Sequence, residues 1–184
     1  MRKVIFGINI TLDGCCDHTN QFADEETHEY WTGVLREAGL LVYGRKTYEL
    51  MVPFWPEVAK TQSATKALNE FARVFDSVER VVFSRTLDSV EDQKTRLVRT
   101  DLRDEILKLK QEQGKNILVG GVDIPSQLIQ FGLVDEYRFV IGPVIAGEGR
   151  RLLDGASLPK KLQLKLVESR ILKSGCVALR YLKQ

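Results

Sequence analysis

The sequence contains little of what marks secreted, membrane-bound or nucleic-acid-binding proteins. Its 184 residues include three cysteines, an odd number without the spacing of a disulfide framework, which favours the reducing cytoplasm. The formal net charge is only +2, so no global electrostatic field indicates nucleic acid or a membrane surface as a partner. No apolar segment approaches the roughly 20 residues that a membrane-spanning helix needs. We therefore expect a cytoplasmic protein that binds a small molecule, with any anion recognised by local groups.

Several familiar binding motifs are also absent. The sequence has no G-x-x-x-x-G-K-[ST], which argues against a P-loop nucleotidase. The segment Gly147–Leu152 matches only half of G-x-G-x-x-G, and it follows Pro143 instead of opening the first strand–helix unit. The run Cys15-Cys16-Asp17-His18, with His28 as a distant partner, could suggest a metal, but adjacent cysteines are poorly placed around one tetrahedral ion. We expect no metal and interpret this run as a loop beside the active site.

What the sequence does contain is an alternation of apolar strands and amphipathic helices. The length suits one domain, residues 1–184, built around a single core. Several apolar runs lack in–out alternation, as expected of strands that are covered on both faces. The expected strands are Val4–Ile10, Leu40–Tyr43, Arg80–Phe83, Asn116–Val119 and Tyr137–Ile141.

Helical patterns lie between these strands, and a different pattern closes the chain. The expected helices are Glu25–Glu37, Ala64–Phe75, Leu102 to about Gln113 after a capping Asp101, and Asp123 to about Gly132. Two strand-like runs, Leu162–Leu172 and Cys176–Leu182, predict an antiparallel hairpin at one edge of the sheet. The fold class is therefore α/β, with three layers: a mixed, mostly parallel central sheet, helices on both faces, and a C-terminal antiparallel hairpin.

Three of the expected strands are followed by turns of similar chemistry. In open α/β sheets ligands bind outside the carboxyl ends of the strands, so these turns can converge on one crevice. Glycine lets backbone N–H groups approach an anion, while Arg and Lys side chains add positive charge. The turns are Gly44-Arg45-Lys46-Thr47, Ser84-Arg85-Thr86 and Gly120-Gly121.

The charges in these turns indicate which dinucleotide they suit. An NAD site offers an acidic side chain to the ribose 2′-hydroxyl, whereas an NADP site offers Arg, Ser or Lys to the 2′-phosphate. Ser84, Arg85 and Arg45 are of the second kind, so we expect NADPH as the cofactor. Each turn alone could equally be a solvated loop. Their shared position after separate strands is what supports a dinucleotide site.

Nearly the whole chain resembles the dihydrofolate reductase-like family, in the branch of the C-terminal reductase domain of bacterial riboflavin biosynthesis. The resemblance is carried, in family order, by ITLDG, YGRKTYELM, FWPE, VVFSRTL, DLRDEILKLK, NILVGGVDI and GLVDEYRFVIGPVIAGEGRRLL. It implies a homodimer and an NADPH site. In that site the phosphate region would be held by Gly44, Arg45, Lys46 and Thr47, the 2′-phosphate by Ser84 and Arg85, the pyrophosphate by Gly120, Gly121 and Val122, and the nicotinamide would be bordered by Asn9 to Gly14.

The resemblance also implies hydride transfer to a C=N or C=O bond, for which the product needs a proton. Asp24 and Asp13 are the candidate proton donors. The alternative for Asp24 is the N-cap of the helix Glu25–Glu37, and the alternative for Asp13 is a turn residue before Gly14. Trp55 would either line the substrate cleft or pack onto the core from a loop. Trp31 lies on a helical stripe and is expected in the core.

Two departures from the folate-reducing members bear on the substrate. Cys15–Asp24 has no Trp-x-Leu-Pro lead, and Pro125-Ser126 stands where those members have an aromatic residue. The riboflavin branch implies instead the reduction of 5-amino-6-(5-phosphoribosylamino)uracil, although no substrate-phosphate site is evident in the sequence. Dihydrofolate reductase activity, a module that binds NADP(H) without turnover, and a plain structural domain are the alternatives. Arg150-Arg151 either attract a phosphate or, as the default interpretation, are solvated loop cations, and Asp135-Glu136 is expected to end the preceding helix and face water.

Overall fold

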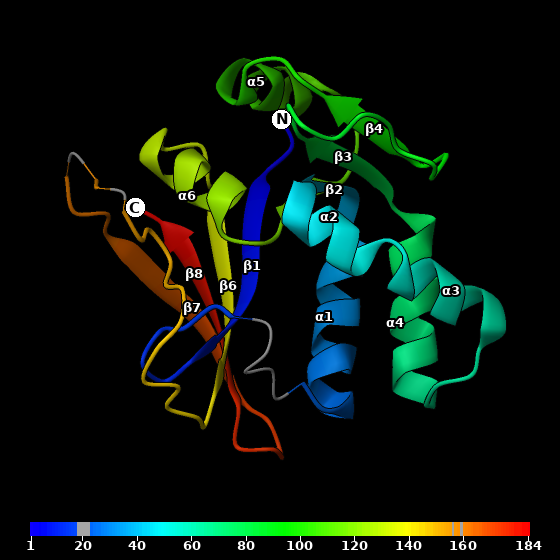
Figure 1. The fold of residues 1–184 in the computed structure, drawn as a ribbon. Coiled ribbons are helices and arrows are strands. Elements are labelled where there is room, and N and C mark those ends of the chain that lie inside the picture. Colours follow the sequence, from blue (N-terminus) through cyan, green and yellow to red (C-terminus); the bar gives the residue numbers. More distant parts are fainter. Residues whose placement is uncertain (18–22, 156, 159) are drawn as a thin grey trace.

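A single mixed sheet organises the described part of the chain, residues 1–17, 23–155, 157–158 and 160–184 of the computed structural model (Figure 1). Its strand order is β4-β3-β2-β5-β1-β6-β8-β7. All neighbours from β4 to β6 are parallel, whereas β8 pairs antiparallel with both β6 and β7. The strands are β1 Val4–Thr11, β2 Ala38–Gly44, β3 Glu79–Phe83, β4 Thr95–Val98, β5 Asn116–Val119, β6 Glu136–Gly142, β7 Leu164–Ile171 and β8 Val177–Lys183. The expected mostly parallel sheet with a C-terminal hairpin at its edge is confirmed.

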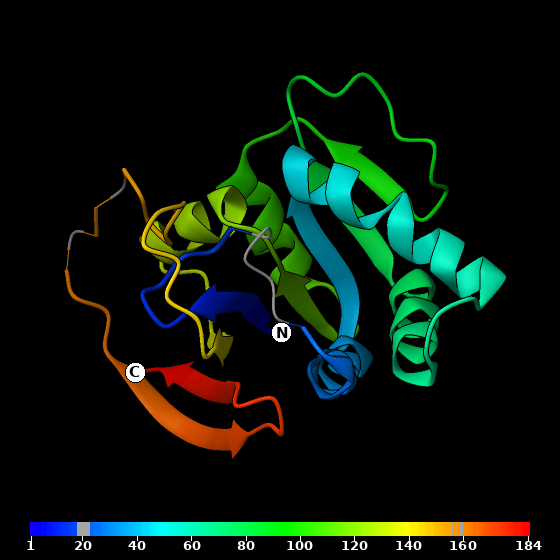
Figure 2. The same ribbon diagram turned by 60° about the horizontal axis from the view of Figure 1, so that its bottom comes forward.

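Helices cover both faces of this sheet, as Figures 1 and 2 show. Side chains alternate between the two faces: Ile5 packs with α1 and α4, while its neighbours Val4 and Phe6 pack with α5 and α6. Two covered faces explain the continuous apolar runs in the sequence. The helices are α1 Glu25–Glu37, α2 Arg45–Met51, α3 Phe54–Thr61, α4 Lys66–Ser77, α5 Leu102–Gln111 and α6 Asp123–Gln130. None of the described helices combines the length and apolarity that crossing a membrane requires.

Local signals place the helix ends close to where the sequence predicts them. Asp24 caps α1, because its Oδ1 accepts the backbone N–H of Thr27 at 2.8 Å. Asp101 caps α5 in the same way, through the N–H of Asp104 at 3.1 Å. The sheet and the helix caps together fix the relative positions of the carboxyl ends of β1, β2 and β5.

Three elements are missing from the expected strands and helices, namely α2, α3 and β4. The edge strand β4 is short and carries the exposed Arg96, so it lacks the apolar run that marks the inner strands. Helix α3 contains the segment FWPE, in which Pro56 lies in the first turn, where a missing N–H costs nothing. Trp55 therefore lies on a helix and not in a loop.

The expectation that Glu136 faces water is wrong. Its side chain is 2% exposed, because β6 lies inside the sheet between β1 and β8. Arg138 donates to Glu136 Oε1 at 2.6 Å and Arg180 donates to the same oxygen at 2.9 Å, so the buried carboxylate is paired. Burial alone would raise the pKa of Glu136, but these hydrogen bonds hold it below its usual value. This network lies at the opposite end of β6 from the crevice described next.

Candidate functional site

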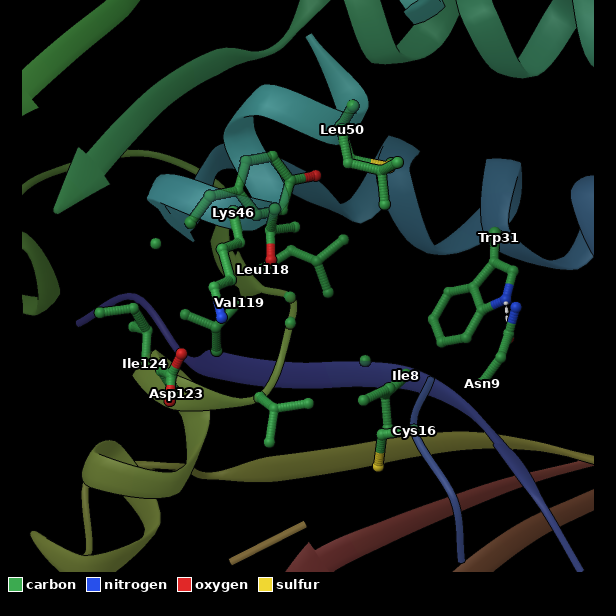
Figure 3. Close-up of a pocket in the computed structure, with 18 of the residues that line it drawn as sticks. Ile8, Asn9, Cys16, Trp31, Lys46, Leu50, Leu118, Val119, Asp123 and Ile124 are labelled. Atoms are coloured by element: carbon green, nitrogen blue, oxygen red, sulfur yellow. Dashed lines mark hydrogen bonds between the residues drawn. The ribbon is translucent and has the colours of Figure 1, made fainter. Parts of the chain in front are cut away.

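A pocket of about 990 Å³ opens at the carboxyl ends of β1, β2 and β5 (Figure 3). The chain leaves β1 toward β2 through α1, and it leaves the adjacent β5 toward β6 through α6, on the other face of the sheet. Neighbouring strands whose connections run in opposite directions form a topological switch point, which is where open α/β sheets bind ligands. The fold therefore places this pocket where such a sheet ordinarily binds a ligand.

One end of the pocket, here called the turn end, consists of Gly44–Thr47, Gly120–Asp123 and Arg150. Gly121 has a φ of +84°, and a Cβ there would collide with the hydroxyl of Thr47. A Cβ on Gly120 would lie 2.9 Å from the ring of Tyr43. Both glycines are therefore required by the close approach of the β5–α6 turn to the β2–α2 turn. Thus two of the three turns singled out in the sequence do meet.

Arg45 connects the turn end to the loop that follows β3. Its guanidinium donates to Glu49 Oε1 at 2.7 Å and to Thr86 Oγ1 at 3.1 Å. Ser84 Oγ accepts the backbone N–H of Thr86 at 3.2 Å, which folds this third turn back on itself. Neither Ser84 nor Arg85 lines the pocket, so the third turn extends the site only through Arg45.

The side chains of Arg150 and Arg151 are 41% and 42% exposed, so both are solvated, but both also form contacts that the sequence did not predict. Arg150 lines the pocket and forms an ion pair with Asp123, with Nη1 to Oδ2 at 3.3 Å. The hydrogen bond from Arg150, with Lys46 nearby, holds the pKa of Asp123 below its usual value. Arg151 donates to the backbone oxygen of Asp13 at 3.1 Å. Arg150 therefore contributes to the pocket, and Arg151 connects the loop after β6 to the turn after β1.

Asp13 fastens that loop and does not reach the pocket lining. Its carboxylate accepts the Thr11 hydroxyl at 2.5 Å and the N–H groups of Ala146 and Gly147 at 3.1 and 2.9 Å. The Thr11 hydrogen bond and these two N–H groups hold the pKa of Asp13 well below its usual value. Gly14 forms the adjoining turn at a φ of +81° and also lies outside the pocket lining. The turn interpretation of Asp13 describes this geometry, and a proton-donor role does not.

Asp24 is likewise unsuited to donating a proton. It is the N-cap of α1, and it is not among the residues that line the pocket. Burial alone would raise its pKa, but hydrogen bonds from Thr27 and Ser174 together hold the pKa of Asp24 below its usual value. Hydrogen bonds therefore lower the pKa of both carboxylates that the sequence offered as donors, and neither residue lines the pocket.

The other end of the pocket, here called the aromatic end, consists of His28 and Trp31 of α1, Trp55 of α3 and Phe71 of α4. The His28 ring lies 5.6 Å from the Trp55 ring and 5.5 Å from the Phe71 ring, centroid to centroid. Trp55 and Phe71 are 4.5 Å apart, edge to face. Trp55 thus lines the cleft, as one of its two sequence interpretations proposed.

Trp31 was expected in the core, but it is half-buried against the pocket. Its indole N–H donates to Asn9 Oδ1 at 2.7 Å, the contact drawn in Figure 3. A Cβ on Gly7 would lie 2.7 Å from the indole ring, so glycine is what lets the ring rest on β1. Sequence reasoning treated His28 only as a distant metal partner. Its spacing of three residues from Trp31 on an amphipathic helix was the signal that places both on one face.

Comparison with known proteins gives one consistent family. The model of the RibD C-terminal domain matches residues 2–178. The protein YyaP of Bacillus subtilis (strain 168), itself described as uncharacterized, is 30% identical over 98% of this chain and 94% of its own.

Solved structures agree on the fold. A Shewanella sp. PV-4 protein, provisionally named as a riboflavin biosynthesis protein, has a TM-score of 0.74 at 19% identity and covers 99% of each chain. A Thermotoga maritima diaminohydroxyphosphoribosylaminopyrimidine deaminase/5-amino-6-(5-phosphoribosylamino)uracil reductase has a TM-score of 0.69 at 14% identity. This chain aligns over its full length with 57% of that longer protein.

Proposed function

The chain belongs to the family of the RibD C-terminal domain, and from that premise we propose that it is an NADPH-dependent reductase of a flat heterocycle, of the aminopyrimidine or pterin class. The observation that carries the proposal is the meeting of the turns Gly44–Thr47 and Gly120–Val122 at the sheet's switch point. These turns suit an anionic dinucleotide, and the aromatic end beyond them suits a flat ring. Reduction of 5-amino-6-(5-phosphoribosylamino)uracil is the specific reaction that the family suggests.

The residues at the turn end fit the phosphates of NADPH. Gly120 and Gly121 leave the backbone open where any larger residue would collide with Tyr43 or Thr47. Lys46 supplies a mobile cation beside them, and Arg150 neutralises Asp123, which would otherwise repel a pyrophosphate. Arg45, held by Glu49 and Thr86, supports the choice of NADPH over NADH, because its guanidinium lies beside the Ser84–Thr86 turn.

The middle of the pocket is where the nicotinamide would lie. Gly7, Ile8 and Asn9 of β1 line it there, and Figure 3 places Ile8 between the Lys46 side and the Trp31 side. When bound, NADPH would supply a hydride to the ring held at the aromatic end. The chain's own part is to hold the two rings together and to exclude water from between them.

The cofactor proposal is tested by calorimetric titration with NADPH and NADH. Arg45→Ala is expected to weaken NADPH roughly tenfold, the scale of one lost charge-assisted hydrogen bond at a half-exposed site, and to leave NADH unchanged. Arg103→Ala, which removes an exposed guanidinium from α5, is the matched control. Equal affinity for the two dinucleotides, or binding of neither, would refute the proposed cofactor.

One observation favours a second candidate function. Asp13 and Asp24 both lie off the pocket lining with lowered pKa values, which suits a module that binds NADP(H) without turnover. NADPH oxidation in the presence of a heterocyclic substrate separates the two candidates. A homodimer, as the family resemblance implies, stays a prediction to be checked by light scattering.

A further inference from the structure

We propose that the aromatic end takes a flat heterocycle without a phosphate or other anionic tail, and that His28 binds and protonates this ring through Nε2. The inference rests on the proposed reductase function and names the substrate class and the proton donor of the same site. It departs from the phosphoribosyl substrate that the family suggests, and it assigns a role that neither Asp13 nor Asp24 can fill.

The distribution of charge argues against an anionic tail. Among the described lining residues the cations are Arg45, Lys46 and Arg150, and all three belong to the turn end. Arg45 is paired with Glu49, and Arg150 is paired with Asp123. The described rings in contact with His28 are those of Trp55 and Phe71, and neither carries a charge. A phosphate placed among them would lose its hydration without gaining a counter-ion, which is strongly unfavourable.

The geometry of His28 fixes which ring nitrogen is available. Its Nδ1 lies 2.7 Å from the backbone oxygen of Asp24. A carbonyl oxygen can only accept, so Nδ1 carries a hydrogen in either charge state, and Nε2 is the nitrogen left for a ligand. Trp55 and Phe71 pack together against the ring, with centroids 5.6 and 5.5 Å from that of His28, and limit its rotation. Asp24, the candidate donor from the sequence, therefore positions another donor through its backbone.

Three other proton-bearing groups in the pocket, those of Cys16, Glu49 and Asp123, are less suited to the task. Burial raises the pKa of the Cys16 thiol to about 11, so this group keeps its proton. Glu49 and Asp123 are ion-paired at the turn end, away from the aromatic cluster. Histidine is the side chain that ordinarily exchanges a proton near neutral pH, and His28 is the one described histidine of the chain.

The proposed step balances as follows. The carbon that receives the hydride supplied by NADPH belongs to a C=N bond, which lies in the ring of a dihydropterin and at C1′ of the open-chain imine of a ribosylaminouracil, and the electron pair of the π bond moves to the nitrogen. That nitrogen takes the proton from Nε2 of protonated His28, so one C–H and one N–H bond form. His28 is left neutral, with its remaining proton on Nδ1, and is reprotonated from water. The net change consumes NADPH and one proton and yields NADP⁺ and the reduced substrate.

The test uses two matched pairs of probes. The first pair is 5-amino-6-(ribosylamino)uracil with and without its 5′-phosphate, and the second is 7,8-dihydrofolate and 7,8-dihydropterin, which lacks the anionic tail. Binding is read by quenching of tryptophan fluorescence, since Trp31 and Trp55 line the site, and turnover by NADPH absorbance. We expect the tail-free member of a pair to match or exceed its partner in affinity and in kcat/KM.

His28→Gln and His28→Phe separate binding from proton transfer, with the neighbouring exposed Glu29→Gln as control. Gln keeps a hydrogen-bonding group, so its affinity for the ring should stay within about threefold while kcat falls roughly 100-fold. Phe keeps only the ring contacts and should lose affinity about tenfold as well. NADPH affinity should be unchanged in all three variants.

Several results would overturn the inference. A tenfold or greater preference for the phosphorylated or glutamyl probe refutes the tail-free substrate, and wild-type kcat in His28→Gln refutes the proton role. A protein that binds NADPH but none of the four heterocycles, or binds them without turnover, overturns the inference and leaves the cofactor proposal intact. Failure to bind NADPH at all is the separate failure of the proposed function.

Discussion

The contact between Gly121 and Thr47 offers a sharp test of the site, because it joins the two turns that define the turn end. Gly121→Ala forces a side chain into a backbone with a φ of +84° and drives its Cβ into the Thr47 hydroxyl. The left-handed backbone alone costs about 1–2 kcal/mol for a residue other than glycine. The collision adds about 1 kcal/mol more, the lower range of overpacking, because Thr47 has only a few rotamers on a helix in which to move away.

Thr47→Ala separates these two costs. Removing the hydroxyl leaves Thr47 Cβ, 3.4 Å from the new Cβ, as the nearest atom of that residue. The double variant should therefore be relieved of the collision but should keep the backbone strain. A double-mutant cycle measured by chemical denaturation should then show a favourable coupling of about 1 kcal/mol. NADPH titration of the same four proteins should show Gly121→Ala as the weakest binder. Additive costs, with coupling below about 0.5 kcal/mol, would refute the view that the two turns are pressed together at this point.

Two further predictions concern the loops at the mouth of the pocket. Asp13 has a folded-state pKa below its ordinary value, so its stabilising effect is present above about pH 4 and is lost as the pH falls from there toward the folded pKa. Asp13→Asn should destabilise the protein at neutral pH and flatten the acid limb of a thermal-melting profile, and an unchanged acid limb would contradict the loop-fastening role. Cys16, with a pKa of about 11 against 9.0 for a free thiol, should react with iodoacetamide roughly 100-fold more slowly than an exposed cysteine, as followed by mass spectrometry. Labelling at the rate of a free thiol would show that Cys16 is not buried in the pocket wall.

The elements that the sequence predicted well are those whose signals are local. The strand β5, Asn116–Val119, and the helix α1, Glu25–Glu37, have the predicted bounds, because one is a short apolar run between polar residues and the other begins at a capping Asp24. The turns at Gly44 and Gly120 were found because the ends of parallel strands share one edge of a sheet. None of these inferences needed knowledge of what lies across the fold.

The parts that the sequence did not predict depend on contacts between distant segments. The ion-pair partner of Arg150, Asp123, is 27 residues away in sequence, so no local pattern indicates the contact. Trp31 was expected in the core because its helical stripe is apolar. Its ring instead packs on Gly7 of β1, and its indole N–H donates to Asn9 at the pocket. Helix α3 was not predicted from the sequence; it follows Pro53 and contains Pro56, and proline is ordinarily a helix breaker.

The case of Asp24 shows why one residue can satisfy a local rule and still mislead about chemistry. A carboxylate at an N-cap stabilises the helix most while it is ionised, since its charge strengthens the hydrogen bond from the N–H of Thr27. A proton donor must be protonated when the hydride arrives, so the two roles favour opposite states of one group. The proposed donor is a different residue one turn later on the helix, His28, whose Nδ1 donates to the backbone oxygen of Asp24. If His28 is the donor, Asp24→Asn, which can still cap α1, should keep most of the activity, whereas a catalytic Asp24 would lose it.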